Sequence, residues 1–329
     1  MPDFPEVRLH VVTGKGGTGK TTVAAALALA LASGGRKVLL VEVEGRQGIA
    51  QLFDTPPLTY DETRVAVAPD GGDVHALSID PEYALLDYLH MFYKLSPTGV
   101  AARTLRRIGA IEFATTIAPG LRDVLLTGKV KEAVVRKSRT GAYAYDAVVL
   151  DAPPTGRIAR FLNISSEISG LAKVGPLRTQ SDGVMAVLRS PQTAVHLVTL
   201  LEEMPVQETL DGVHDLQRIG LPVGGVVVNA VRAPLLDPAD LVAAESGTLD
   251  IAALASGLEK AGLDAPDALV ASLAAEAGDH AVRVALEERG RDALGALERQ
   301  SYELPLLPDS IDLGGLYELA GLLHEQGMA

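Results

Sequence analysis

Short apolar runs alternate with longer helix-forming runs along most of this chain. Apolar runs of about four to eight residues, bounded by Gly, Pro or polar residues, are typical of buried strands. They predict strands at residues 9–12, 36–44, 74–79, 145–151, 194–200, 223–229 and 303–307. Strands that alternate with helices pair in parallel and are covered on both faces. The pattern therefore predicts an α/β fold with one doubly wound, mostly parallel sheet.

The helical pattern dominates three other stretches of the chain. Residues 81–140 and 157–190 are expected to form a helical subdomain inserted into the sheet domain. Residues 231–300 are rich in Ala, Leu and acidic side chains, and they predict an acidic helical region. No repeat or low-complexity linker divides the sequence. We therefore expect residues 1–329 to form a single domain.

Two parts of this pattern have alternative interpretations. Residues 83–95 are apolar on nearly every side, which suits either a buried helix or a helix that docks a client. The buried helix is the commoner outcome. His196 alternates with apolar residues in the predicted strand 194–200, and a core histidine is commoner in that setting than a ligand.

A glycine-rich stretch, Thr13-Gly-Lys-Gly-Gly-Thr-Gly-Lys-Thr-Thr22, joins the first predicted strand to a predicted helix at 23–31. A strand, a glycine-rich turn and a helix are the context of a phosphate-binding loop. Glycines let backbone N–H groups approach phosphate oxygens, and the dipole of the new helix favours the same anion. The alternative is a glycine-rich turn without a ligand. We predict that a nucleotide is bound by Gly14, Lys15, Gly16, Gly17, Thr18, Gly19, Lys20, Thr21 and Thr22.

The predicted strand 145–151 ends in Asp151. An apolar strand that delivers a carboxylate beside a phosphate loop has the form of a Walker B element. We expect Asp151 and the Thr21 hydroxyl to hold Mg²⁺, directly or through water, while Lys20 reaches the β- and γ-phosphates. The stiff turn that follows suits a sensor of the γ-phosphate: Pro153, Pro154, Thr155 and Gly156.

Composition limits the classes of function. The chain has 329 residues, of which 47% are hydrophobic and 22% charged, as in an ordinary globular protein. The absence of cysteine excludes disulfides, Cys-ligated zinc and iron–sulfur clusters. The formal net charge of −13 argues against nucleic acid as the main ligand. The longest apolar run, 23–32, is too short to span a membrane and the N-terminus has no signal-peptide pattern, so a cytoplasmic location is expected.

The nucleotide-facing motifs resemble those of the arsenite-pump ATPase (ArsA) family and of the ATPases that target tail-anchored membrane proteins. The likeness is to the bacterial anion-transporting ATPase-like branch in particular, and it covers most of the chain. Residues 14–21 are similar to the family's deviant Walker A loop, in which a second lysine, here Lys15, reaches across a dimer to the partner's nucleotide. The alternative for Lys15 is a solvated loop lysine. The stretch 151–156, Asp-Ala-Pro-Pro-Thr-Gly, resembles the family's switch II.

Four further segments carry the resemblance. The segments 119–123 and 202–209 resemble the start of a family helix and a Glu-rich family segment. Asn229 is similar to the asparagine that reads adenine in the family, and 304–309 resembles the loop that closes over the base. The resemblance therefore implies adenine contacts from Asn229, Pro308 and Asp309.

Two positions depart from the family pattern. The family's switch I reads Asp-Pro-Ala-His, with the aspartate positioning the attacking water, whereas Glu44-Gly-Arg-Gln47 aligns with it here. Glu44 can still orient water, but its carboxylate lies one methylene further out. We therefore expect ATP hydrolysis to be slow or to be coupled in a different way. Arg157 stands where the family has a histidine after switch II. The zinc-clamp and arsenite-binding cysteines of relatives are missing as well.

The resemblance implies a Mg-ATP-dependent dimeric switch ATPase with Lys15 and Glu44 as catalytic residues. ATP binding and hydrolysis would be coupled to a membrane-protein client or transporter, with a second copy or a paralogue as the dimer partner. The protein would be cytoplasmic or peripheral at a membrane. Glu44 motivates an alternative, a nucleotide-binding scaffold or regulatory subunit that pairs with a hydrolysing paralogue. A DNA- or membrane-positioning ATPase of the same class is disfavoured because the amphipathic tail 316–326 has no Lys or Arg.

Overall fold

The computed structural model describes residues 2–94, 119–163, 176–308 and 311–329. They form an eight-stranded sheet in the order β3-β4-β2-β5-β1-β6-β7-β8. All neighbouring strands pair in parallel except β3 and β4, which are antiparallel. The strands are β1 (Leu9–Gly14), β2 (Lys37–Glu42), β3 (Thr63–Val67), β4 (Asp73–Ser78), β5 (Ala147–Asp151), β6 (Thr193–Thr199), β7 (Val223–Val231) and β8 (Ser301–Pro305). The predicted α/β class with one mostly parallel sheet is confirmed.

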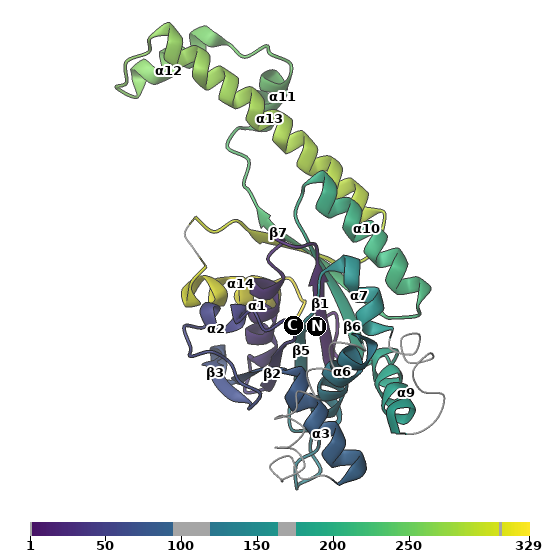
Figure 1. The fold of residues 1–329 in the computed structure, drawn as a ribbon. Helices are drawn as coiled ribbons and strands as arrows, with labels where there is room; N and C mark the ends of the chain where they lie inside the picture. Colours follow the sequence, from purple (N-terminus) through teal and green to yellow (C-terminus); the bar gives the residue numbers. More distant parts are fainter. Residues whose placement is uncertain (1, 95–118, 164–175, 309–310) are drawn as a thin grey trace.

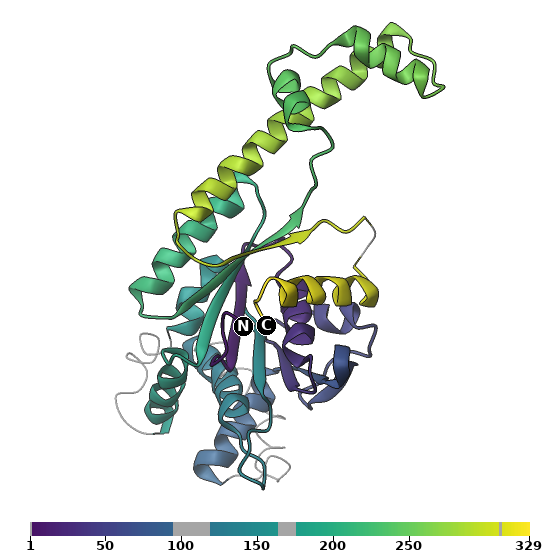
Figure 2. The ribbon, with the colours of Figure 1, turned by 180° about the vertical axis from the view of Figure 1, so that it is seen from behind.

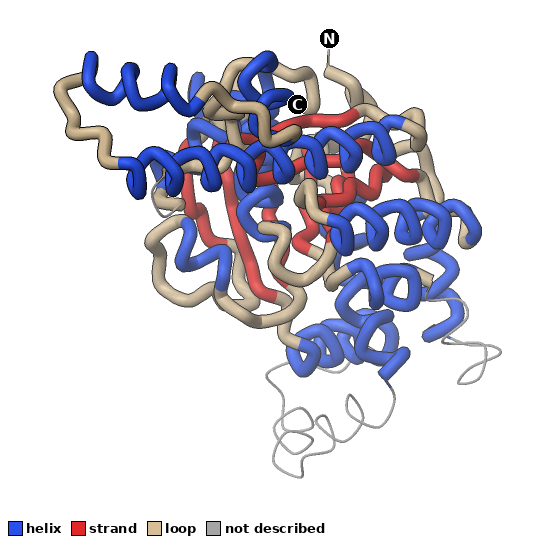
Figure 3. The backbone as a smooth tube through the Cα atoms, turned by 90° about the horizontal axis from the view of Figure 1, so that it is seen from above, coloured by secondary structure: helices blue, strands red, loops and turns tan. Residues whose placement is uncertain are grey.

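Helices cover both faces of the sheet, as Figures 1 and 3 show. One face packs against α1 (Lys20–Ala32), α2 (Gly48–Leu52) and α14 (Leu313–Glu325). The other packs against α3 (Pro81–Tyr93), α6 (Pro119–Val135), α7 (Thr155–Leu162), α9 (Pro176–Leu188) and α10 (Glu203–Arg218). Alternate residues of β2 enter the two layers: Val38 and Leu40 face α1, whereas Leu39 and Val41 face the other layer. A strand buried on both faces reads as a continuous apolar run, which is why these strands were predictable.

The edge strand β3 was not predicted, because only part of it is buried. Its residues Thr63–Val67 are exposed or half-buried, so they form no apolar run. The strand lies outside β4 at the edge of the sheet and pairs with it in antiparallel fashion. A strand with one solvated edge needs few apolar residues, and a sequence pattern of this kind does not distinguish it from a loop.

The segment between β7 and β8 forms a helical arm that projects away from the sheet (Figures 1 and 2). It consists of α11 (Pro238–Glu245), α12 (Ile251–Lys260) and the 29-residue α13 (Asp267–Gly295). The lower part of α13 packs beside α10, and its far end carries α11 and α12. His280 of α13 accepts a hydrogen bond from the Leu235 backbone N–H at 3.0 Å, which ties the arm's first strand-to-helix loop to its long helix.

The structure confirms the expectation for His196 and corrects the one for residues 83–95. His196 is completely buried, so the predicted core histidine is confirmed. Within α3, Leu85 and Leu86 are buried against the sheet, while Tyr83 and Met91 are exposed. This helix is therefore amphipathic in its described part, and the expectation that it is buried on nearly every side is wrong for these two residues. No helix in the described ranges is long and apolar enough to cross a membrane.

Candidate nucleotide site

The predicted phosphate loop connects β1 to α1 at the carboxyl edge of the sheet. Gly17 and Gly19 have φ values of 91° and 84°, a left-handed backbone that L side chains rarely adopt. A Cβ atom at Gly14 would lie 2.1 Å from the Val198 carbonyl oxygen of the neighbouring strand, so close packing also requires a glycine there. The turn then passes directly into α1, whose first backbone N–H groups have no partners within the helix. This geometry suits an anion.

Side chains within the loop hold it in a defined shape. The Thr18 hydroxyl donates to the Lys15 carbonyl at 2.9 Å, and the Lys20 ammonium donates to the same carbonyl at 3.4 Å. Asn229, on β7, donates from Nδ2 to the Thr18 carbonyl at 3.0 Å. Lys20 therefore lies over the loop with a weak, replaceable contact, and burial lowers its pKa while Asp151 and Glu44 oppose that shift.

Thr21 and Asp151 meet at the start of α1. The Thr21 hydroxyl donates to Asp151 Oδ2 at 2.7 Å, across 130 residues of sequence. Burial raises the pKa of Asp151 to about 6, and the negative charges of Glu42 and Glu44 act in the same direction, whereas the Thr21 hydrogen bond and Lys20 act against it. Burial disfavours the charged form of this carboxylate, so a nearby cation would stabilise that form strongly. Two hard oxygen ligands side by side fit Mg²⁺.

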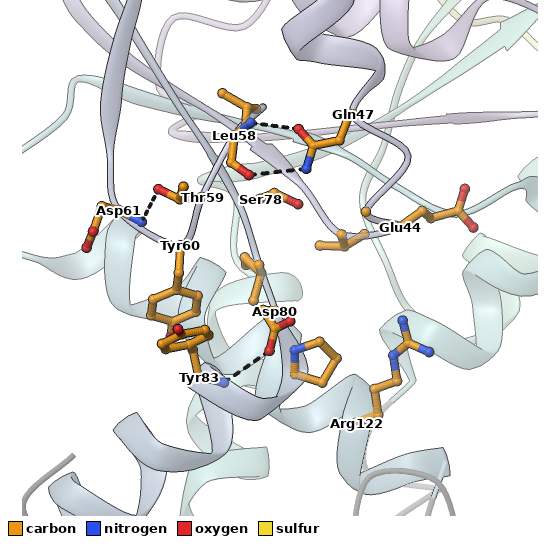
Figure 4. Close-up of a pocket in the computed structure, with 14 residues that line it drawn as sticks. Glu44, Gln47, Leu58, Thr59, Tyr60, Asp61, Ser78, Asp80, Tyr83 and Arg122 are labelled. Atoms are coloured by element: carbon orange, nitrogen blue, oxygen red, sulfur yellow. Dashed lines mark hydrogen bonds between the residues drawn. The ribbon is translucent and has the colours of Figure 1, made fainter. Parts of the chain in front are cut away.

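Switch I, residues 44–47, follows β2 and is shaped by Glu42. The carboxylate of Glu42 is 2% exposed and accepts the backbone N–H groups of Gln47 at 3.1 Å and Gly48 at 2.9 Å. The Gln47 side chain in turn exchanges two hydrogen bonds with the Leu58 backbone, at 2.6 and 3.1 Å, as Figure 4 shows. Glu42 lies within the predicted strand 36–44, and the sequence assigned it no role. Its structural role is to hold the turn that presents Glu44.

Glu44 points toward two arginines. Its side chain is 20% exposed and lies 3.5 Å from Arg46 Nε and 3.5 Å from Arg157 Nη1. Arg157 comes from the first turn of α7, directly after switch II, residues 153–156. The two switches are therefore joined by an ion pair at this point.

Switch II is tied to the phosphate loop and to α10. The Thr13 hydroxyl of β1 donates to the Pro153 carbonyl at 2.7 Å. The Thr155 hydroxyl donates to the Glu208 carboxylate of α10 at 3.2 Å, and the Lys15 ammonium lies 3.2 Å from the same carboxylate. Sequence reasoning gave Glu208 no role. No pattern in the segment 202–209 distinguishes Glu208 from Glu202 and Glu203.

Of the remaining predicted site residues, Pro308 is the one that the structure describes without a contact to this cluster. Pro308 is exposed in the loop after β8, and no described contact links it to the phosphate loop. Asp309 lies outside the described residues. Gly16 and Thr22 lie in the loop and in the first turn of α1. Among the described residues no group of three or more His, Asp or Glu side chains converges as a metal site. A Mg²⁺ ion in a nucleotide site needs only one or two protein ligands besides phosphates.

A cavity of about 550 Å³ opens beside switch I (Figure 4). Glu44, Gln47 and Tyr60 line it, together with Tyr83 and Arg122 from α3 and α6. The Tyr60 and Tyr83 rings stack at 5.5 Å between centroids. The cavity lies between switch I and the helical layer. A change in the conformation of switch I would therefore change the shape of the cavity.

The comparison with known proteins decides the family. Residues 7–189 match the model of the anion-transporting ATPases. The chain belongs to this family. It is 58% identical to the ATPase BagA of Mycobacterium tuberculosis, over 98% of this chain and 94% of that one. It is 26% identical to the putative arsenical pump-driving ATPase 2 of Aquifex aeolicus, over 68% and 80% of the two chains.

A more distant relative is the arsenical pump-driving ATPase of Escherichia coli, 28% identical over 70% of this chain and 41% of that one. Membership of the anion-transporting ATPase family confirms the resemblance drawn from the motifs. The protein is an ATPase of this family, and a nucleotide is therefore its substrate.

Proposed function

We propose that this anion-transporting ATPase is a Mg-ATP-dependent switch that works as a dimer and acts on a membrane-protein client or transporter. The observation that carries the proposal is the position of Lys15. It follows the first glycine of the loop, and its ammonium lies 3.2 Å from the Glu208 carboxylate of α10. A loop lysine that its own nucleotide does not require is available for a partner's phosphates.

Within one protomer, the loop would bind the phosphates through its backbone N–H groups and Lys20. The residues that would hold Mg²⁺ are Thr21 and Asp151, whose oxygens already lie 2.7 Å apart. The ion would neutralise charge on the β- and γ-phosphates. The Oδ1 atom of Asn229 accepts no hydrogen bond from any other described residue, and it would accept one from the adenine amino group. Pro308 and Asp309 would complete the adenine contacts.

Glu44 would orient the attacking water, and Lys15 of the partner would stabilise the charge that develops on the transferred phosphoryl group. The γ-phosphate would be sensed by switch II, because Pro153 is bonded to Thr13 and Thr155 to Glu208. The helix that begins at Thr155 packs against α6 and α10. A shift of switch II would therefore reach the helical layer, where a client or transporter would dock.

The cell location that fits this proposal is the cytoplasm, with contact to the membrane through the client or transporter. Arsenite capture through thiolates is excluded because the chain has no cysteine. The dimer partner would be a second copy or a paralogue.

A second function is favoured by one observation, the ion pairs of Glu44 with Arg46 and Arg157. A carboxylate engaged by two arginines is less available to water. The chain would then be a nucleotide-binding regulatory subunit whose paralogue hydrolyses ATP.

Turnover of the purified chain separates the two functions. The switch ATPase predicts Mg-dependent phosphate release by the chain alone, reduced roughly 10²-fold or more by Glu44→Gln. The absence of Mg-dependent turnover by the chain alone contradicts the hydrolase and supports the regulatory subunit. Turnover that survives Glu44→Gln contradicts only the role of Glu44. Partners that co-purify in cells with the Glu44→Gln protein test the client, and DNA or soluble enzymes alone would contradict the membrane link.

A further inference from the structure

The two departures from the family's switch pattern contact one another in the structure. Glu44 follows β2 in switch I, and Arg157 lies in the first turn of α7 after switch II. Arg157 Nη1 donates to Glu44 Oε1 at 3.5 Å across 113 residues of sequence. In the sequence they are two separate substitutions. In the structure they form one unit, in which the longer glutamate meets the longer arginine.

The pair is loose and accessible. The Arg157 side chain is 64% exposed, and the 3.5 Å separation is at the long limit of a hydrogen bond. A cavity of about 240 Å³ borders it, lined by residues in or beside the two switches and on α6 and α7: Val43, Arg46, Arg122, Asp123, Pro153 and Phe161. An exposed pair of this kind adds little to the stability of the fold. Its contact turns the Glu44 carboxylate toward Arg157 and leaves the carboxylate room to move.

The backbone connects Arg157 directly to switch II. Arg157 lies two residues after Thr155, and its backbone N–H bonds to the Pro154 carbonyl at 2.8 Å. A displacement of switch II therefore displaces the Arg157 guanidinium, and with it the carboxylate that it holds. Arg46 also contacts Glu44, but it lies in the same loop and cannot transmit a movement from switch II.

We propose that Arg157 is the positioning residue for Glu44, and that the Glu44–Arg157 pair transmits the state of switch II to switch I during ATP hydrolysis. This inference rests on the proposed role of Glu44 in orienting water. It assigns a specific task to the arginine that replaces the family's histidine. A misplaced carboxylate lowers the rate of the chemical step and leaves nucleotide binding nearly intact.

The test compares Arg157→Gln, Arg157→Lys and Arg122→Gln. Arg122 lines the same cavity, yet it forms no hydrogen bond or ion pair with any other described residue, so Arg122→Gln controls for the loss of one positive charge there. Arg157→Gln should lower kcat by roughly tenfold or more with the KM for Mg-ATP within about twofold. Arg157→Lys should recover part of that loss, and Arg122→Gln should keep wild-type kcat. The combination Arg157→Gln with Glu44→Gln should be no slower than Glu44→Gln alone, because the two residues act as one unit.

Equal losses of kcat in Arg157→Gln and Arg122→Gln would overturn the inference. A double variant in which the two single losses of kcat multiply would overturn it as well. Hydrogen exchange supplies a readout that needs no turnover. With Mg²⁺ and a non-hydrolysable ATP analogue, residues 43–48 and 153–157 should both gain protection in the wild type. In Arg157→Gln only 153–157 should respond. A response of 43–48 that is unchanged in Arg157→Gln contradicts the inference, whereas a wild type without Mg-ATP turnover contradicts the hydrolase instead.

Discussion

The ammonium of Lys15 lies 3.2 Å from the carboxylate of Glu208 in its own chain. Both side chains are about one-third exposed, at 30% and 36%. A pair with that exposure contributes about 0–1 kcal/mol, so it can be exchanged for a stronger partner such as a phosphate. In the proposed dimer, Glu208 would hold Lys15 beside the loop until a second protomer presents its nucleotide.

Release of Lys15 should favour dimer formation. In Glu208→Gln the cis ion pair is lost, so the dimer formed with a non-hydrolysable Mg-ATP analogue should tighten by up to about fivefold. Sedimentation velocity over a range of protein concentrations measures this change. Glu203→Gln, on the same helix and exposed, is the matched control and should leave the dimer unchanged. A weaker dimer in Glu208→Gln would mean that Glu208 supports the interface rather than restraining Lys15.

Removal of one proposed metal ligand should abolish the effect of Mg²⁺ and leave nucleotide binding in place. Asp151→Asn keeps a partner for the Thr21 hydroxyl but loses the charge, so turnover should fall roughly 10²-fold or more. Nucleotide affinity in this variant should become independent of Mg²⁺. Calorimetric titration of the nucleotide with and without Mg²⁺ checks this. Retention of the wild-type Mg²⁺ effect would place the ion on other ligands.

Close packing at Gly19 predicts a sharp effect of a single methyl group. A Cβ atom at this position would lie 2.3 Å from Asn229 Nδ2, and φ is +84°. The left-handed backbone alone costs about 1–2 kcal/mol for a residue with a Cβ atom. Gly19→Ala should therefore weaken nucleotide binding by roughly tenfold or more. Gly34→Ala shares the left-handed φ, at +75°, but has open space and lies away from the site, so it should keep wild-type affinity.

The buried histidine pair predicts how stability depends on pH. His10 Nδ1 lies 3.1 Å from His196 Nε2, and His196 Nδ1 accepts the Gly225 backbone N–H at 3.1 Å. Burial lowers the pKa of His10 to about 4, and it lowers the pKa of His196 as well. Between the ordinary value near 6.5 and these lowered values the unfolded chain binds more protons than the folded chain. The free energy of unfolding should therefore fall as pH drops below about 6.5, by about 1.4 kcal/mol per pH unit for each histidine.

Chemical denaturation at several pH values between 7 and 4.5 measures this slope. His10→Leu should reduce the slope, whatever its effect on stability at pH 7. His214→Gln, which changes an exposed histidine on α10, should leave the slope as it is. A wild-type stability that does not change between pH 6.5 and 5 would contradict the assignment of two neutral buried histidines.

The sequence predicted the sheet well because the physical signal was strong. Strands such as β2 are buried on both faces, so their residues are apolar without interruption. The phosphate loop was recognised because Gly17 and Gly19 meet a backbone requirement that few other residues satisfy. The half-exposed strand β3 and the exposed flank of α3 left no comparable pattern.

Contacts between distant segments could not be predicted from the sequence. Nothing in residues 202–209 indicates that Glu208 meets Lys15, and nothing near Glu44 indicates that Arg157 is its partner. Such pairs depend on the order of strands in the sheet, which places β2, β5, β1 and β6 side by side. The motifs therefore identified the candidate site, while its connections came from the topology.

The central claim, that Lys15 acts across a dimer, is tested most directly by turnover per protomer as a function of protein concentration. The wild type should become more active with rising concentration and reach a plateau once the dimer is saturated. Lys15→Ala should bind Mg-ATP with nearly wild-type affinity, yet its turnover should be lower by roughly 10²-fold or more at every concentration. Turnover per protomer that is independent of concentration, and equal in the wild type and in Lys15→Ala, would contradict the claim.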